Sequence, residues 1–195
     1  MGNWKIFKKE SKKDRTDHSD QIVNTFGMLV EDFYAQRRPI RTRAVKLSLI
    51  NLGHQLGYKV YANGLQPEDI QKVDQPFVNK EWLFDLHWYT DDNDPYTVKS
   101  LPLVVECEWN PKRKGDSRIF YSGVKYDFQK LLVSNAALRL MIFTIENTDT
   151  LGTLKSYFQK SIETYEHLNI NARFLFIAFD NRSKCFYYKR IKKHR

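Results

Sequence analysis

The chain has 195 residues, of which 42% are hydrophobic, and this supplies one well-buried core rather than two full domains. No apolar run approaches the roughly 20 residues that cross a bilayer, and two cysteines without a CxxC pair exclude a disulfide framework and a cysteine-based zinc site. A formal net charge of +9 favours a polyanion as partner, with nucleic acid the first to consider.

Charge is concentrated at the two ends of the chain. Residues 1–20 mix lysine and aspartate with little apolar periodicity, which predicts a poorly ordered arm in which Trp4, Ile6 and Phe7 are candidates for local docking. Residues 21–195 are predicted to form a single domain, and its C-terminal end from Arg182 to Arg195 holds seven Lys or Arg residues and no Asp or Glu. We expect a soluble, cytoplasmic protein with no membrane partner, and we keep a homodimer open as its assembly.

Apolar periodicity predicts two helices first, one from Ile22 to Gln36 and one that begins at Pro39 and stops at Gly53 and Gly57. The rest of the chain alternates between strand and helix patterns. In order these are strands Tyr58–Tyr61, Trp82–Tyr89 and Leu101–Trp109, helix Ser122–Ser134, strand Leu138–Ile145, helix Leu151–Leu168, and strands Ala172–Phe179 and Cys185–Ile191. The order predicts a β-meander followed by β-α-β crossovers, which is an α/β fold with a mixed central sheet flanked by helices.

Two of the predicted strands carry acidic residues. Strand alternation puts Asp85 on the less apolar face of its strand, together with His87. We interpret His87 as a strand-surface histidine, with contact to a metal-bound water as the alternative. Glu106 and Glu108 project side by side from one face of the next strand, where each resists ionisation of the other. A bound Mg²⁺ ion would relieve that repulsion, because Mg²⁺ prefers carboxylate oxygens. The alternative is that Glu106 and Glu108 are solvent-facing residues of an edge strand.

These acids also carry a family resemblance. Asp85, then Leu103–Trp109 with Glu106 and Glu108, and then a helix containing Tyr126–Leu132 resemble the D…ExE/K…helix core of the PD-(D/E)xK nucleases. The resemblance implies a restriction-endonuclease-like fold and a Mg²⁺ (or Mn²⁺) site built from Asp85, Glu106 and Glu108. It also implies metal-dependent hydrolysis of phosphodiester bonds in nucleic acid, with DNA as the expected substrate.

The sequence departs from the family at one position. Glu108 stands where the family most often has lysine, and some members resemble this chain in having Glu there. Other members take the lysine from the following helix, and Lys130 is the candidate for that role here. The alternative for Lys130 is an ordinary surface pair with Asp127, three residues earlier on the helix.

Basic residues are the candidates for binding the nucleic-acid backbone. They fall in the loop after the acidic strand and in the C-terminal end, and they are Lys112, Arg113, Lys114, Arg118, Lys189, Arg190, Lys192 and Lys193. The alternative for the loop is a solvated basic segment. Two other functions stay open, a non-catalytic nucleic-acid-binding protein that keeps the nuclease fold and a protein-interaction subunit. The chain contains no HExxH, GxSxG or P-loop motif, which argues against zinc peptidases, serine hydrolases and NTPases.

Overall fold

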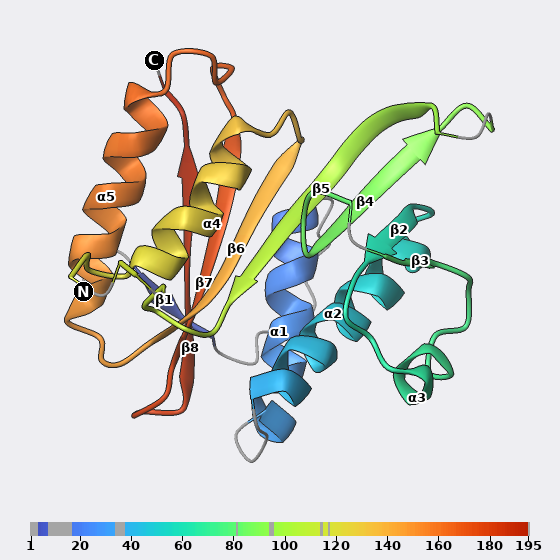
Figure 1. The fold of residues 1–195 in the computed structure, drawn as a ribbon, viewed down its shortest axis with the longest axis horizontal. Coiled ribbons are helices and arrows are strands. Elements are labelled where there is room, and N and C mark those ends of the chain that lie inside the picture. The colour runs from blue at the N-terminus through green and yellow to red at the C-terminus, as the bar shows by residue number, and fades with distance from the viewer. Residues whose placement is uncertain are drawn as a thin grey trace. The chain divides into compact units, whose positions relative to one another are not determined.

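A computed structural model describes residues 4–7, 17–33, 38–80, 82–93, 96–113, 115–116 and 118–194, with only the backbone given at residues 30–33 and 38. The chain divides into two compact units (Figure 1). Unit 1 comprises Met1–Phe7 and Glu106–Arg195, and unit 2 comprises Lys8–Val105. In the described parts of the chain, no helix is both long and apolar enough to cross a bilayer.

Unit 2 combines helices with a mixed sheet. Its strands lie in the order β5-β4-β2-β3, with antiparallel pairing of β5 with β4 and of β4 with β2, and parallel pairing of β2 with β3. The antiparallel run confirms the predicted meander. The elements are α1 (His18–Phe33), α2 (Arg38–Gln55), β2 (Lys59–Ala62), α3 (Pro67–Ile70), β3 (Val78–Asn79), β4 (Leu86–Asp91) and β5 (Val98–Glu108), whose last three residues belong to unit 1.

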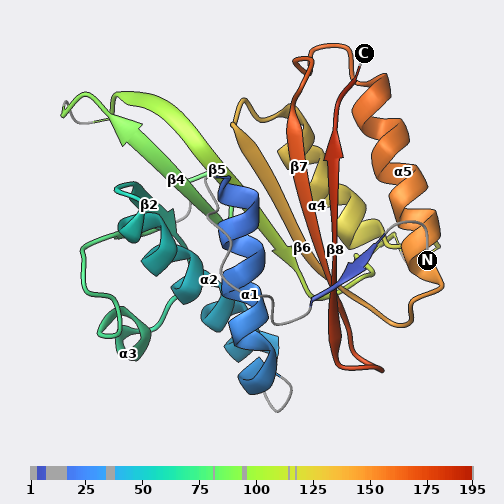
Figure 2. The ribbon, with the colours of Figure 1, turned by 180° about the vertical axis from the view of Figure 1, so that it is seen from behind.

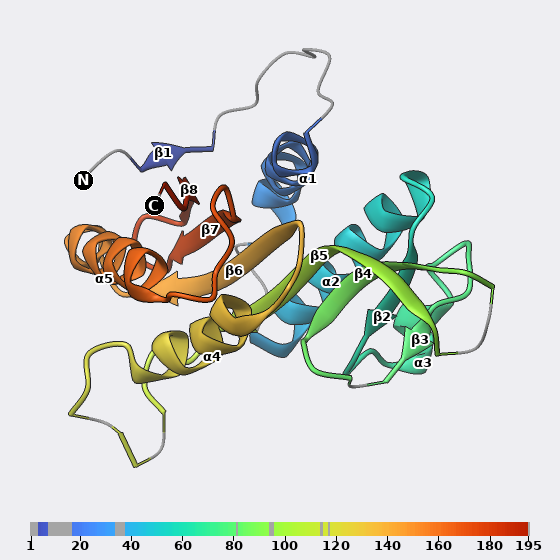
Figure 3. The same cartoon turned by 90° about the horizontal axis from the view of Figure 1, so that it is seen from above.

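Unit 1 is built around a β-α-β crossover. Its strands lie in the order β6-β7-β8-β1, with β6 parallel to β7 and the other pairs antiparallel. Its helices α4 and α5 cover the same face of these strands (Figure 1, Figure 2 and Figure 3). The elements are β1 (Lys5–Ile6), α4 (Ser122–Val133), β6 (Leu138–Ile145), α5 (Thr150–Thr164), β7 (Arg173–Asp180) and β8 (Cys185–Lys192). The protein is therefore α/β with mixed strand directions, as its element order predicts.

The core of unit 1 is a stack of aromatic rings between α4, α5 and β7. Phe158 of α5 stacks on Phe176 of β7 with ring centroids 4.2 Å apart, and Phe128 of α4 meets Phe158 edge-on at 4.9 Å. All three side chains are fully buried. Burying rings of this size dominates the energetics of a core, so this stack fixes both helices on the sheet.

Residues Trp4–Phe7 are packed onto unit 1. β1 pairs with β8, and the Trp4 indole Nε1 donates a hydrogen bond to the Leu151 carbonyl at 3.0 Å. Trp4 is only 8% exposed, so it belongs to the core of unit 1. Trp4–Phe7 thus dock on unit 1, as their apolar side chains allowed, because a buried tryptophan anchors them, while residues 1–3 and 8–16 lie outside the described part of the chain.

One predicted helix stop is misplaced. α2 continues through Gly53 to Gln55, and the turn that ends it uses Gly57, whose φ of +79° suits glycine. Gly53 instead faces the fully buried Trp88, where an added Cβ would lie 2.6 Å from the indole Nε1. That indole nitrogen donates to the Leu49 carbonyl at 3.0 Å. Gly53 is therefore required for a close approach of α2 to β4, not for a stop.

We predict that Gly53→Ala destabilises unit 2 by roughly 1–3 kcal/mol, because the new methyl group overpacks a buried indole. Helix propensity alone would change stability in the opposite direction by about 1 kcal/mol. Gly27→Ala is the matched control, since a Cβ at Gly27 of α1 meets nothing within 4 Å. Denaturant unfolding of the two variants should show loss of stability at Gly53 and no loss at Gly27. Equal effects would contradict the close-approach explanation.

Candidate metal and nucleic-acid site

The acidic end of β5 faces helix α4 within unit 1. Glu106 is only 2% exposed, and its Oε2 accepts from the Lys130 Nζ of α4 at 3.2 Å. Two residues on, Glu108 lies against the start of α4, where a Cβ on Gly123 would be 3.1 Å from Glu108 Oε2. Both carboxylates thus share a face, as strand alternation predicts. The solvent-facing alternative is wrong for Glu106, because α4 covers it.

Glu108 is held by the backbone of the loop that follows β5, next to the beginning of α4. The Asn110 amide donates to Glu108 Oε1 at 2.5 Å, and the Gly123 amide donates to the Pro111 carbonyl at 3.2 Å. A helix N-terminus carries a partial positive charge, which favours a carboxylate beside it. The lack of a side chain at Gly123 lets Glu108 come close enough to benefit.

Lys130 of α4 bridges an acid of its own helix, Asp127, and an acid of β5, Glu106. Its Nζ lies 2.9 Å from Asp127 Oδ1 and 3.2 Å from Glu106 Oε2. Partial burial alone would lower the pKa of Lys130, but hydrogen bonds and charges from Asp127 and Glu106 outweigh it and hold that pKa above its usual value. Lys130 is therefore a cation at any ordinary pH. The predicted ion pair of Lys130 with Asp127 is therefore present. Lys130 also contacts the buried Glu106 of β5.

Asp85 lies in unit 2 and has its own lysine. β4 begins only at Leu86, so Asp85 precedes the strand instead of lying inside it. The Lys46 Nζ of α2 donates to Asp85 Oδ1 at 3.0 Å and to the Asn63 carbonyl at 3.0 Å. Lys46 is 3% exposed, which makes its charge dependent on Asp85. Removing the Asp85 carboxylate would thus leave a buried ammonium with one acceptor fewer.

Sequence reasoning missed Lys46, although a signal for it was present. Lys46 precedes Leu49 and Ile50 of α2 by three and four residues, and this spacing places it on the buried stripe of the helix. Leu49 and Ile50 are fully buried. A lysine within such a stripe predicts a buried acidic partner, because an isolated buried charge is too costly to keep.

His87 is not a strand-surface histidine. It is 1% exposed, because the rings of Tyr61 and Trp82 cover it. The tyrosine ring stacks on the imidazole at 4.9 Å, and the indole lies at 4.6 Å. Burial lowers the pKa of His87 to about 4, so the ring is neutral near pH 7.

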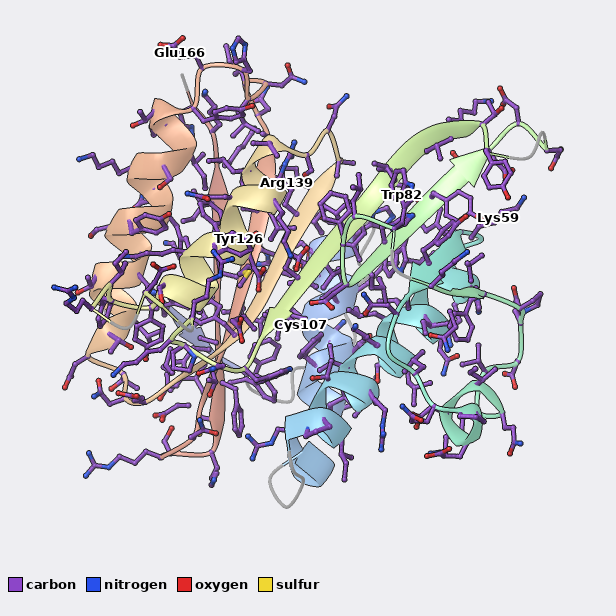
Figure 4. All side chains as sticks on the ribbon, viewed as in Figure 1. Lys59, Trp82, Cys107, Tyr126, Arg139 and Glu166 are labelled. Carbon is purple, nitrogen blue, oxygen red and sulfur yellow. The ribbon has the colours of Figure 1, made fainter. Side chains whose placement is uncertain are left out.

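The basic loop after β5 presents exposed cations beside α4. Lys112, Arg113 and Arg118 are exposed, while Lys114 lies outside the described residues. The Arg113 amide donates to the Ser122 hydroxyl at 2.8 Å, and its guanidinium lies 3.7 Å from the centre of the Tyr126 ring. Figure 4 labels Tyr126 on α4, the helix that carries Lys130. Arg113 therefore ties the loop to α4, while the exposed side chains of Lys112 and Arg118 leave the alternative of a solvated segment open for them.

The C-terminal cations are divided between the two faces of a strand. In the β7–β8 register Lys189 is opposite Phe176, on the face that α5 covers, whereas Arg190 is opposite Leu175 on the other face. Lys192 shares the face of Arg190 because side chains alternate along a strand. Lys193 is 4% exposed and donates to the Tyr165 carbonyl at 2.5 Å. Lys193 is therefore buried away from any phosphate, whereas phosphate binding by Lys189, Arg190 and Lys192 stays a prediction for two separate faces.

Carboxylate oxygens are ligands that hard cations prefer, but unit 1 offers only two such side chains at this site. Glu106 and Glu108 supply oxygen donors on one face of unit 1, which suits Mg²⁺ or Mn²⁺. Among the described residues, no three His, Cys, Asp or Glu side chains form a group that could hold a metal ion. Unit 1 therefore contributes a pair of candidate ligands, both of them close to cationic or backbone donors.

We predict that Lys46→Met destabilises the protein by about 2 kcal/mol, because it leaves the Asp85 carboxylate and Asn63 without their buried donor. The matched control is Lys59→Met, which removes a lysine from an exposed pair with Asp91 of the same unit. That change should alter stability little, because exposed ion pairs contribute little. Denaturant unfolding of both variants distinguishes the two environments, and equal losses would contradict the buried role of Lys46.

Comparisons with protein-family models, curated proteins and solved structures found no match to this chain. Its functional assignment therefore depends on the sequence pattern and on the geometry of the acids, lysines and basic loop described above.

Proposed function

We propose that this chain is a metal-dependent nuclease with a restriction-endonuclease-like fold, which hydrolyses phosphodiester bonds of nucleic acid, DNA first of all. The observation that carries the proposal is the contact of Lys130 Nζ with the buried Glu106 carboxylate at 3.2 Å. Some members of the family that the chain resembles take a lysine from the helix after the acidic strand, and α4 supplies one that contacts Glu106. An ordinary surface pair would not need the buried partner.

Asp85, Glu106 and Glu108 would hold Mg²⁺ or Mn²⁺ in this proposal. Asp85 enters this proposal through the family resemblance alone, because it belongs to unit 2 whereas Glu106 and Glu108 belong to unit 1. When bound, the metal supplies an activated water for attack on phosphorus and balances charge on the leaving oxygen.

The protein's own side chains would orient the phosphate. Lys130 remains a cation at working pH, so it acts as an electrostatic group and hydrogen-bond donor to the phosphate and not as a general base. The Arg113 guanidinium is held over the ring of Tyr126, which lies on the same helix as Lys130. This contact fixes the position of a second cation before the phosphate binds. Lys112 and Arg118 line one shared hollow of about 270 Å³. Both side chains would contact the sugar-phosphate backbone of the nucleic acid next to the cutting site.

A second candidate is a nucleic-acid-binding protein that keeps this fold without catalysis. The observation that favours it is that Asp85 and Glu106 each make an ion pair with a lysine, Lys46 and Lys130. Such pairs can be structural, since a buried carboxylate needs a partner whether or not it works in catalysis. The two candidates are distinguished by strand cutting. A nuclease cuts nucleic acid and loses this activity when Asp85 or Glu106 is replaced, whereas a binding protein cuts none.

We predict that the protein cuts DNA when Mg²⁺ or Mn²⁺ is added, and that Glu106→Gln lowers the cutting rate at least about 100-fold because a metal ligand is lost. Lys130→Met should lower turnover at least about tenfold while changing DNA affinity much less, because the cation serves the transition state. Calcium should support binding with poor cutting. The measurement is a nuclease assay on linear, branched and single-stranded substrates, with binding measured in parallel.

Two controls sharpen this experiment. Glu166→Gln removes an exposed carboxylate that follows α5 (Figure 4). The protein with this substitution should cut DNA at the wild-type rate. Asp85→Asn is preferred to Asp85→Ala, because the amide oxygen still accepts from Lys46 and the fold is kept. Melting temperatures show whether each variant is folded. Salt-sensitive binding by a wild type that cuts nothing under any metal would contradict catalysis and support the second candidate.

We also predict that the basic loop, and not the exposed face of β8, determines the salt dependence of DNA binding. Replacing Lys112 and Arg118 together with Gln should flatten the slope of log affinity against log salt by about 2, since each lost phosphate contact removes about 0.9. Replacing Arg190 and Lys192 should change the slope much less, because these residues lie on the sheet face opposite α4 and α5. The reverse pattern would place the nucleic acid on that other face.

A further inference from the structure

Unit 2 contains a hollow with aromatic walls that the proposed nuclease site does not use. Its volume is about 330 Å³, which is within the range of small-molecule pockets. We call it the aromatic pocket. It lies on the face of β2 and β4 opposite the one where Trp88 meets α2, because side chains alternate along these strands. Its lining includes Tyr61, Trp82, His87, Tyr89, Asp91 and Tyr96.

The rings of the pocket are arranged around His87. Tyr61 stacks on the imidazole with an interplanar angle of 14°, and the Tyr61 and Tyr89 ring centroids are 5.2 Å apart. Trp82 closes another side at 4.6 Å from His87, yet keeps 43% of its surface exposed. A flat ligand entering here would find ring faces already held in place.

His87 supplies a polar group without a protein partner. Neither of its ring nitrogens has a hydrogen-bond partner among the described residues, although the side chain is 1% exposed. Buried polar groups in native structures are nearly always hydrogen-bonded, so an unsatisfied imidazole in a pocket wall points to a ligand. A neutral imidazole offers one donor and one acceptor, which matches the mixed donor and acceptor edge of a nucleobase.

Tyr96 stands at the mouth of the pocket in an uncommon backbone conformation. Its φ is +67°, a left-handed value that bulky residues seldom adopt, and the side chain is 97% exposed. The conformation places an aromatic ring in solvent at the pocket lining, where an arriving base can stack against it.

The charges around the pocket argue against a cationic ligand. Asp91 lines the pocket, but both its oxygens accept from Lys59, at 2.8 and 2.6 Å. Its charge is therefore already balanced, and a ligand ammonium would meet a lysine at the rim. The same ion pair neutralises Lys59, so ring faces and the imidazole remain to select the ligand.

We propose that the aromatic pocket binds one nucleobase of a single-stranded or unpaired nucleic-acid segment, stacked against Tyr61 and Trp82 and hydrogen-bonded to His87. This function is separate from strand cutting. It requires neither a metal ion nor the acids of β5, so it can hold where the nuclease proposal fails.

Tryptophan fluorescence tests the proposal. Of the four tryptophans, all of them described, only Trp82 is substantially exposed, so a stacking base should quench its emission. The protein carries Glu106→Gln and is titrated without divalent ions with short single-stranded DNA homopolymers, a same-length abasic strand, mononucleotides and tetramethylammonium. Base-bearing strands should quench Trp82, and the abasic strand should not. Quenching by mononucleotides as well would show that a free nucleotide suffices as the source of the base.

Variants locate the effect. Tyr61→Leu should weaken binding of base-bearing strands at least about tenfold, because one stacking wall is lost. His87→Phe keeps an aromatic ring and should reduce the preference among bases. Phe77→Leu is the control, since Phe77 belongs to the same unit but not to the pocket lining. Equal quenching by the abasic strand, saturation by tetramethylammonium alone, or an unchanged affinity in Tyr61→Leu would each overturn the proposal.

Discussion

The buried carboxylate of Glu106 is the constraint around which unit 1 is arranged. A charge that is 2% exposed must be balanced, and the nearest cation comes from α4 through Lys130. For Lys130 to reach β5, α4 must lie close along the strand, and Gly123 at its beginning permits this approach beside Glu108. The rings of Phe128 and Phe158 then hold α4 against α5. Packing and charge balance therefore specify the same helix position.

The same principle explains why the absent motif lysine does not leave the acids unsupported. At the position where the PD-(D/E)xK nucleases that this chain resembles most often have lysine, the chain has Glu108. This residue adds a second negative charge on the face of Glu106. The structure compensates in two places, with the helix N-terminus at Glu108 and with Lys130 two turns further along α4. Positive charge is thus supplied from the following helix instead of from the strand. A second lysine, Lys46, balances Asp85 from a different helix in unit 2.

Sequence patterns predict the long, regular elements of this fold better than its contacts. β6 matches its predicted range of Leu138–Ile145, because all eight of its residues are buried and turn signals bound the run. The apolar side chains of Trp4, Ile6 and Phe7 indicated local docking, but the pairing of β1 with β8 was not predicted, because it is a long-range effect that local periodicity cannot reveal. For the site, the positions of Glu106 and Lys130 follow from strand and helix periods. The burial of His87 and Lys193 does not, because distant side chains cause it.

The two proposed sites differ in electrostatic character, and this difference has a chemical meaning. Beside α4, charged groups dominate, with Arg113 and Lys130 next to carboxylates that suit a phosphate and a metal ion. In the aromatic pocket Asp91 is neutralised and His87 is uncharged, so ring faces and an imidazole remain to make contacts. A nucleic-acid strand offers a charged backbone and neutral bases, and neither site is suited to both. In the two proposals, each unit would thus bind one part of the same kind of ligand.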